Sequence, residues 1–145
     1  IRFEEVRLDG EVARALEARA GSAAYRIVNL LLIDGAPVLL DEVYLARALF
    51  PGLDEARFVA RENTMYGFYQ EAFGISVIRV VDRLHAVAAD AEAARAFRVP
   101  AGSPLLEMVR IAYTFADRPV ERRRTLLHTR AYEYRNVIGG ELRTG

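Results

Sequence analysis

Residues 12–43, VARALEARAGSAAYRIVNLLLIDGAPVLLDEV, decide the fold of this 145-residue chain. The stretch predicts a short helix, a glycine turn, a strand from Ala24 to Ile33, a tight turn and a returning strand from Val38 to Leu45. Asp34-Gly35 is a strong hairpin signal, because both residue types readily take the positive φ angles of a type I′ turn. The first strand is almost continuously apolar, which predicts a central strand covered on both faces.

The helix and glycine turn recur later in the chain at one fixed offset. The first copy contains Asp9, Glu11, Ala13, Arg14, Ala15, Ala20, Gly21 and Ser22, and the second contains Asp90, Glu92, Ala94, Arg95, Ala96, Ala101, Gly102 and Ser103. Pro37-Val38 recurs as Pro119-Val120, at an offset one residue longer than that of the other pairs. One supersecondary unit used twice predicts a sheet with an internal pseudo-twofold axis and a pocket between the two copies.

The remaining elements complete an antiparallel-dominated α+β domain. Each repeat helix is expected to start at its aspartate and to continue toward its glycine, Gly21 or Gly102. A middle helix is expected between a cap at Asn63 or Thr64 and Gly74. Further strands are expected over residues 1–8, 76–87, 105–115 and 120–129, and residues 139–145 read as a loose tail. The sum is about six strands and three short helices, with the helices covering one side of the sheet.

The charge, the cysteine content and the lack of long apolar runs argue against a DNA-binding domain, a disulfide-bonded protein and a membrane protein. Formal net charge is zero, so the chain lacks the basic excess that DNA-binding domains usually carry. No cysteine is present, which excludes disulfides and thiolate metal sites. No apolar run approaches a membrane span and no signal peptide heads the chain, so we expect a cytoplasmic protein. Because Ile1 is not an initiator methionine, we expect that an N-terminal part is missing.

Catalytic and metal-binding patterns are absent from the sequence. His85 and His128 are the only histidines, and neither stands at ligand spacing with a carboxylate. No serine lies in a Gly-x-Ser-x-Gly elbow, and there is no glycine-rich phosphate loop. The sequence therefore predicts no metal, no cofactor and no catalytic residue.

Two carboxylates interrupt strands that otherwise favour burial. Asp41 and Glu121 both lie on a returning strand just after its turn. A carboxylate in such a place is either paired with an arginine or directed at a ligand. The alternative is that Glu121 pairs with a neighbouring arginine while Asp41 faces solvent.

Arg122-Arg123-Arg124 follows Glu121, but strand residues alternate between faces. Arg123 is therefore expected to face inward with Glu121 and Thr125. Arg122 and Arg124 are expected on a solvated outer face, and the three arginines do not form one basic patch.

Several stretches, in this order and spacing, resemble the UTRA domain of HutC/FarR-type regulators in the GntR family of bacterial transcription factors. They are Tyr25-Arg26-Ile27, Asp34-Gly35-Ala36-Pro37, Val43-Tyr44-Leu45, Phe50-Pro51-Gly52-Leu53, Thr64-Met65-Tyr66, Phe73-Gly74, Ala94, Phe97, Gly102-Ser103-Pro104-Leu105-Leu106, Arg110, Arg118-Pro119-Val120-Glu121 and Tyr132-Glu133-Tyr134. The resemblance runs from about Val12 to Tyr134.

The resemblance implies a chorismate lyase-like fold with a ligand cleft. The effector-binding and dimerisation domain would span residues 1–138. A winged helix-turn-helix domain would precede Ile1 and would make all contacts to DNA. A small metabolite would bind this domain, and the homodimer would couple that binding to operator affinity.

The resemblance also assigns a binding site. Sugar-phosphate-binding members carry an Arg-x-Arg pair where this chain has Asn29 and Leu31, so a sugar phosphate is the less favoured effector. The effector-binding residues implied are Asn29, Leu31, Asp41, Thr64, Glu121, Arg123 and Tyr132. Since Arg123 replaces a common serine, the predicted effector carries a carboxylate or a similar single anion that Arg123 meets.

Two other readings stay open at this stage. A dimerisation module with a vestigial pocket would have a cleft filled by apolar side chains such as Leu31. A lyase-like enzyme would share the fold, because fold alone does not decide function.

Overall fold

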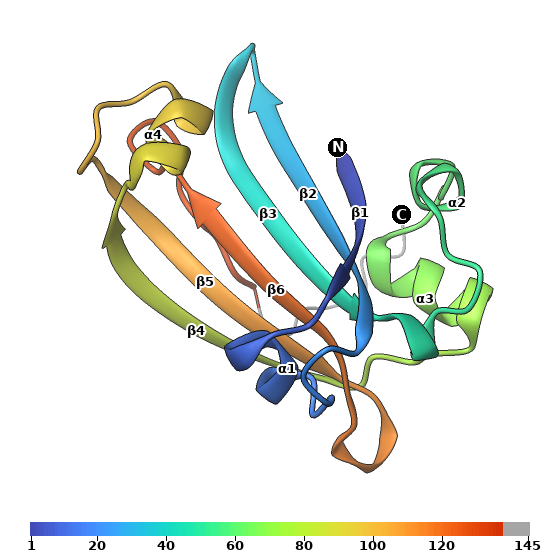
Figure 1. Cartoon of the computed structure of the whole chain (residues 1–145). Helices are drawn as coiled ribbons and strands as arrows, with labels where there is room; N and C mark the ends of the chain where they lie inside the picture. Colours follow the sequence, from blue (N-terminus) through green and yellow to red (C-terminus); the bar gives the residue numbers. More distant parts are fainter. Residues whose placement is uncertain (138–145) are drawn as a thin grey trace.

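The computed structural model describes residues 1–137, and the predicted tail over residues 139–145 lies outside the described residues. Within them, one six-stranded antiparallel sheet has the order β1-β2-β3-β6-β5-β4 (Figure 1). Its strands are β1 (Arg2–Arg7), β2 (Ala23–Ile33), β3 (Ala36–Ala46), β4 (Arg79–Ala88), β5 (Pro104–Tyr113) and β6 (Pro119–Leu127). The predicted α+β class and six-stranded sheet are confirmed.

The strand order contains the predicted pseudo-twofold relation. β3 and β6 are adjacent at the centre, while β1 and β4 lie at the two edges. The backbone repeats as well: Leu8 N–H donates to Ser22 O over 2.9 Å, and Ala89 N–H donates to Ser103 O over 2.8 Å. Gly21 and Gly102 both have a φ of 84°. Two copies of one unit thus form the two halves of the sheet.

Helices lie on both faces of the sheet, so the prediction of helices on one side is wrong. We call one side the α3 face, which carries Tyr25 and Val43, and there α2 (Glu55–Val59) and α3 (Met65–Phe73) pack. We call the other side the α1 face, which carries Ala24 and Tyr44. There α1 (Gly10–Ala15) covers one end and α4 (Ala91–Phe97) covers the other. Each repeat supplies one helix to the α1 face, and the segment between the repeats covers part of the α3 face.

The helix boundaries differ from the prediction in two places. α1 ends at Ala15, well before Gly21, because Glu17 takes a positive φ of 50° that breaks the helix. α2 was not predicted, since its five residues are too few to show a helical period; Asp54 caps it by accepting Arg57 N–H at 2.8 Å. The described chain therefore has four α-helices rather than three.

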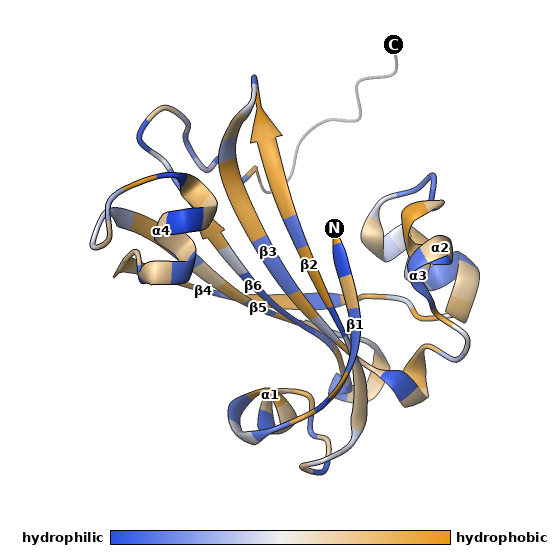
Figure 2. Cartoon of the chain, turned by 45° about the horizontal axis from the view of Figure 1, so that its top comes forward, coloured by the Kyte–Doolittle hydropathy of each residue, from blue (hydrophilic) through white to orange (hydrophobic). Residues whose placement is uncertain are grey.

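β2 is not a central strand covered on both faces. It lies second from an edge, and Leu30, Leu31, Leu32 and Ile33 are 40, 50, 44 and 38% exposed. The reason is the register: β6 pairs with β3 only as far as Leu39, so the tip of the β2–β3 hairpin has no third strand beside it. Figure 2 shows hydrophobic colour at this free end of β2. Asp34 and Gly35 form the predicted turn, with φ angles of 51° and 77°.

β4 is an edge strand that starts at Arg79, three residues later than predicted. Val80 and Leu84 are on the α3 face, in register with Ala112 and Met108, yet are 39% and 47% exposed. The apolar residues of β4 lie on one face, as predicted, but this face is not buried. The helices α2 and α3 pack over β2 and β3 instead of over β4.

α3 is the helix that positions the candidate site. Thr64 accepts Gly67 N–H at 3.2 Å at its start, and Gly74 closes it with a φ of 67°, both as predicted. Its buried side packs on the largest apolar cluster, formed by Tyr25, Ile27, Val43, Leu45, Phe50, Leu53, Phe58, Phe68 and Tyr69. No helix among residues 1–137 has the length and apolarity needed to cross a membrane.

Candidate functional site

Polar side chains occupy the α3 face where the apolar cluster ends. Because strand residues alternate between faces, Glu121, Arg123 and Thr125 of β6 all point to this side. The register places Thr125 beside Asp41 of β3, and Asp41 beside Asn29 of β2. Three strands thus bring these five side chains, which we call the polar cluster, to one patch of the sheet.

Glu121 is the buried centre of the polar cluster, with 0% of its surface exposed. Its Oε2 accepts the Tyr69 hydroxyl at 2.5 Å, and its Oε1 faces the Tyr66 hydroxyl at 3.4 Å. Arg123 donates to both oxygens, from Nε at 3.0 Å and from Nη2 at 3.1 Å. Burial, together with the charge of Glu121, raises the pKa of Tyr69 well above its usual value, so this hydroxyl stays protonated and donates.

Asp41 is held more loosely. The Thr125 hydroxyl donates to its Oδ1 at 2.5 Å, while Arg123 Nη1 lies 3.9 Å from its Oδ2. Burial raises the pKa of Asp41, against the opposing effects of Thr125 and of the Arg123 charge. Next to it, the Asn29 Oδ1 atom is buried without a hydrogen-bond partner. Two acceptor oxygens therefore lack a good donor.

A second ion pair borders the polar cluster. Arg110 of β5 is in register with Arg123, and its Nε and Nη2 donate to Asp82 of β4 at 2.6 and 2.8 Å. This hydrogen bonding lowers the pKa of Asp82. Arg110 is thus neutralised by a carboxylate of its own.

Replacing Asp41 with asparagine is expected to stabilise the unliganded domain near neutral pH. The folded-state pKa of Asp41 is raised above its ordinary 3.8, so the folded protein loses stability as the pH rises from 3.8 through the raised value. Asparagine removes this loss and keeps an oxygen for the Thr125 hydroxyl. Thermal unfolding measured from about pH 7 downward should show a higher Tm for the variant, with the difference shrinking toward pH 3.8. A variant that is less stable than wild type at about pH 7 would contradict this assignment.

The seven residues predicted for the site fall into three places. Asn29, Asp41, Glu121 and Arg123 are together in the polar cluster. Leu31 and Tyr132 line a neighbouring cavity of about 180 Å³. Thr64 is at the start of α3, where its hydroxyl accepts Gly67 N–H, two residues before Tyr66. Among the described residues, the Thr64 side chain makes no hydrogen bond to the polar cluster.

The last strand, predicted over residues 120–129, does not continue to Tyr132 and Tyr134. β6 ends at Leu127, and residues 128–137 form no strand. The two tyrosines are 39% and 37% exposed. Tyr132 nevertheless reaches the cavity that Leu31 lines.

Of the open alternatives for the carboxylates, the pairing of Glu121 with an arginine is correct, and solvent exposure of Asp41 is wrong. The Asp41 side chain is only 16% exposed. Arg122 is not on a solvated face either. It is 6% exposed on the α1 face, because α1 packs against β6 and brings Glu11 within 3.7 Å of its Nη2.

Sequence reasoning missed Tyr66, Tyr69, Asp82 and Arg110 as neighbours of the polar cluster. The two tyrosines are three residues apart, so a shared helix face was a usable signal. The ion pair between Asp82 and Arg110 joins different strands, and its place depends on a register that the sequence does not reveal.

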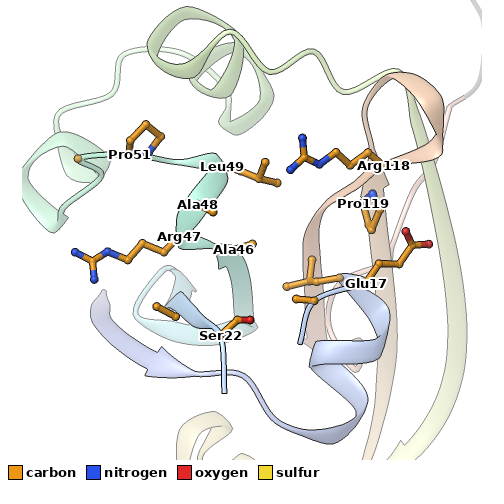
Figure 3. A pocket seen from close by; sticks show the side chains of 13 residues that line it. Glu17, Ser22, Ala46, Arg47, Ala48, Leu49, Pro51, Arg118 and Pro119 are labelled. Carbon is orange, nitrogen blue, oxygen red and sulfur yellow. The ribbon is translucent and has the colours of Figure 1, made fainter. Parts of the chain in front are cut away.

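A larger cavity of about 740 Å³ lies elsewhere, at the end of the sheet between the α1 exit, residues 46–52 and the start of β6 (Figure 3). In Figure 3 the Arg118 side chain extends toward Leu49, whereas that of Arg47 extends away from the cavity. Arg47 pairs with Glu5 at 3.3 Å. Although this cavity is larger, its polar groups do not converge, so the polar cluster is the stronger candidate for specific recognition.

Comparisons with known proteins identify the family. The UTRA domain family model matches residues 1–133. The HTH-type transcriptional repressor PhnF of Mycolicibacterium smegmatis is 26% identical over 126 residues, which cover 87% of this chain and 50% of that protein. A fructoselysine utilization operon repressor of Escherichia coli K12 is 25% identical over 105 residues, covering 72% and 42%. The chain spans about half the length of the curated relatives it matches.

Solved structures match over nearly the whole chain. The ligand-binding domain of a GntR-family transcriptional regulator from Bordetella bronchiseptica is 38% identical, with a TM-score of 0.86 and coverage of 96% of this chain and 87% of that one. The effector domain of PhnF from Mycobacterium smegmatis shares the fold, with a TM-score of 0.81, 24% identity and coverage of 97% and 85%. The chain therefore belongs to the UTRA domain family, the effector-binding domains of GntR-family transcriptional regulators.

Proposed function

We propose that this chain is the sensing domain of a DNA-binding transcriptional regulator, most simply a repressor. A small metabolite bound on the α3 face would control operator binding by a winged helix-turn-helix domain that precedes Ile1. The names of the curated relatives, which are repressors, support this proposal. The zero formal net charge fits a domain that contacts DNA only through another domain.

The observation that carries the proposal is the polar cluster itself. A sheet face that packs apolar side chains at one end presents Asn29, Asp41, Glu121 and Arg123 beyond it. Burying such groups is costly without partners, and Asn29 Oδ1 has none. We assign effector binding to these four residues: Asn29, Asp41 and Arg123 would make the polar contacts, and the fully buried Glu121 would hold Arg123 in place. Leu31 and Tyr132 would form an apolar wall of the site, and Thr64 would form its rim at the start of α3. The effector-binding domain would span residues 1–138.

We propose no catalytic activity for this domain. Glu121, the most buried carboxylate, is held by Tyr69 and by both donors of Arg123, and so is not free to act as a general base. The curated relatives are named as transcriptional repressors, which supports a regulatory role, and we propose a cytoplasmic location.

The test is a thermal-shift screen against carboxylates, amino acids, amines, sugars and sugar phosphates. A ligand at about 100 times its Kd adds about 2.7 kcal/mol, which raises the Tm by several degrees. Asn29→Leu removes an unpaired acceptor, so we expect unchanged or higher basal stability together with loss of the ligand-induced shift. The control is Val59→Ala on α2, an apolar position that is 54% exposed and lies outside the polar cluster and the hairpin tip, and this variant should keep the shift. An Asn29→Leu variant with an undiminished shift would place the effector elsewhere.

We also propose that the chain forms a homodimer and that the free end of the β2–β3 hairpin takes part in the interface. The support is Leu30 and Leu32, which are 40% and 44% exposed and share one face of β2 at a hairpin tip that no third strand borders. Contiguous apolar surface of this kind usually marks an interaction site.

Sedimentation at about 100 μM should give a dimer for the wild type and a monomer for Leu30→Glu/Leu32→Glu, because the substitution would place charges in the interface. Val59→Glu, at a 54% exposed apolar position on α2, should remain dimeric. A monomeric wild type, or a dimeric double variant, would remove this assignment.

A further inference from the structure

The polar cluster and its neighbours carry an uncompensated negative charge. Arg123 binds Glu121 in a two-donor arrangement, and Arg110 binds Asp82 in the same way. Within each pair the arginine and the carboxylate neutralise each other. Asp41 is the remaining charge, and its nearest cation is Arg123 Nη1 at 3.9 Å, on a guanidinium already committed to Glu121.

Two acceptor oxygens at this point, Asn29 Oδ1 and Asp41 Oδ2, have no close hydrogen-bond donor. Asn29 Oδ1 is buried and makes no hydrogen bond. Asp41 Oδ1 accepts the Thr125 hydroxyl, while its Oδ2 has only the distant contact with Arg123. Asn29 and Asp41 are direct register partners on adjacent strands, so their side chains share one spot on the α3 face. A ligand group that suits this spot donates hydrogen bonds and carries positive charge.

An apolar cavity begins one step further along the same strands. Leu31 follows Asn29 by two residues, Leu39 precedes Asp41 by two, and Leu127 follows Thr125 by two, so all three are on the same face. Together with Tyr132 they line the cavity of about 180 Å³, whose charged lining residue is a further carboxylate, Glu133. Its volume suits a short alkyl or aryl group rather than a sugar phosphate.

We infer that the effector is a small amine, whose ammonium group binds Asp41 and Asn29 and whose short apolar body occupies the cavity lined by Leu31, Leu39, Leu127 and Tyr132. This inference rests on the proposed function. It differs from the expectation drawn from the sequence, a carboxylate met by Arg123. Nε and Nη2 of Arg123 donate to Glu121, and the remaining Nη1 lies 3.9 Å from Asp41 Oδ2, so a ligand carboxylate that reached Nη1 would lie against the carboxylate of Asp41.

Matched probes compare a positive with a negative head group on the same apolar body. Calorimetric or ligand-observed NMR titrations would compare butylamine with valerate, and phenethylamine with 3-phenylpropionate. We expect each amine to bind at least tenfold more tightly than its acid partner. Asp41→Asn should weaken amine binding by about ten- to a hundredfold, the loss expected for a hydrogen bond to a charged group. Asn29→Asp should strengthen it.

Glu42→Gln is the matched control. Glu42 is the next residue on β3, but its carboxylate is on the α1 face, where it pairs with Arg26 at 2.7 Å. Amine binding should be unchanged in this variant. Circular dichroism of each variant would verify the fold before titration.

The outcomes separate this inference from the proposed function. The amine inference alone would be overturned if the acids bound more tightly than the amines, or if Asp41→Asn left amine binding intact. It would also be overturned if the screen found a ligand of another chemical class whose binding Asn29→Leu abolishes. If no probe binds and the metabolite screen is also silent, the sensor proposal fails together with it.

Discussion

Glu121→Ala is expected to be among the most destabilising single substitutions in the domain. Removing this carboxylate deprives the Arg123 guanidinium, 16% exposed, of its two hydrogen-bonded acceptors and leaves it only the more distant Asp41, 3.9 Å away; it also leaves the buried Tyr69 hydroxyl without an acceptor. Breaking a buried ion pair from one side costs about 3–5 kcal/mol, because the other charge stays buried. For a domain of this size the Tm should fall by roughly 10 °C or more.

Glu5→Ala is the control for this prediction. Glu5 pairs with Arg47 at 3.3 Å, with side chains 57% and 53% exposed, and such surface pairs contribute only about 0–1 kcal/mol. Urea or thermal unfolding of both variants measures the difference directly. Equal losses in the two variants would mean that Glu121 is not the buried centre of the polar cluster.

Phe50→Ala should produce a loss of similar size by a different cause. Phe50 is 0% exposed, and its ring meets the rings of Tyr69 and Phe73 edge-on at centroid distances of 4.9 and 5.2 Å. Truncating a buried phenylalanine removes apolar burial and leaves a cavity, which costs about 3–5 kcal/mol. Because Phe50 packs against α3, the variant should also loosen the hold of Tyr69 on Glu121 and weaken any ligand-induced shift.

Phe115→Ala is the matched control, since Phe115 is 66% exposed on the β5–β6 turn. Its effect on the free energy of unfolding should stay within about 0.5 kcal/mol. If Phe50→Ala were as mild as Phe115→Ala, the packing of α3 on the sheet would be wrong, and with it the placement of the two tyrosines.

Local chemistry made the hairpin, the α3 boundaries and the internal repeat predictable. Asp34-Gly35 adopts the turn that its residues favour, and Thr64 and Gly74 begin and end α3 as capping residues do. The repeat was visible because helix exits with the same residues adopt the same backbone, down to the common φ of Gly21 and Gly102. These features depend on neighbours in the sequence.

Features that depend on distant parts of the chain were not predictable. The sequence of an apolar run such as Leu30–Ile33 does not show whether other strands cover it. Here the run is exposed because it extends past the end of the pairing between β3 and β6. The burial of Arg122 requires knowing that α1 packs over β6. In the site, strand alternation correctly placed Glu121, Arg123 and Thr125 on one face, but the Tyr69 partner is 52 residues away and depends on how α3 docks.

Backbone amide chemical shifts of the isotope-labelled domain, recorded during titration with a ligand from the thermal-shift screen, locate the bound effector. We expect the largest changes at Asn29, Asp41, Arg123 and Thr125, on three neighbouring strands of the α3 face. Changes confined to Ser22, Arg47 and Arg118, which line the 740 Å³ cavity at the other site, would contradict it.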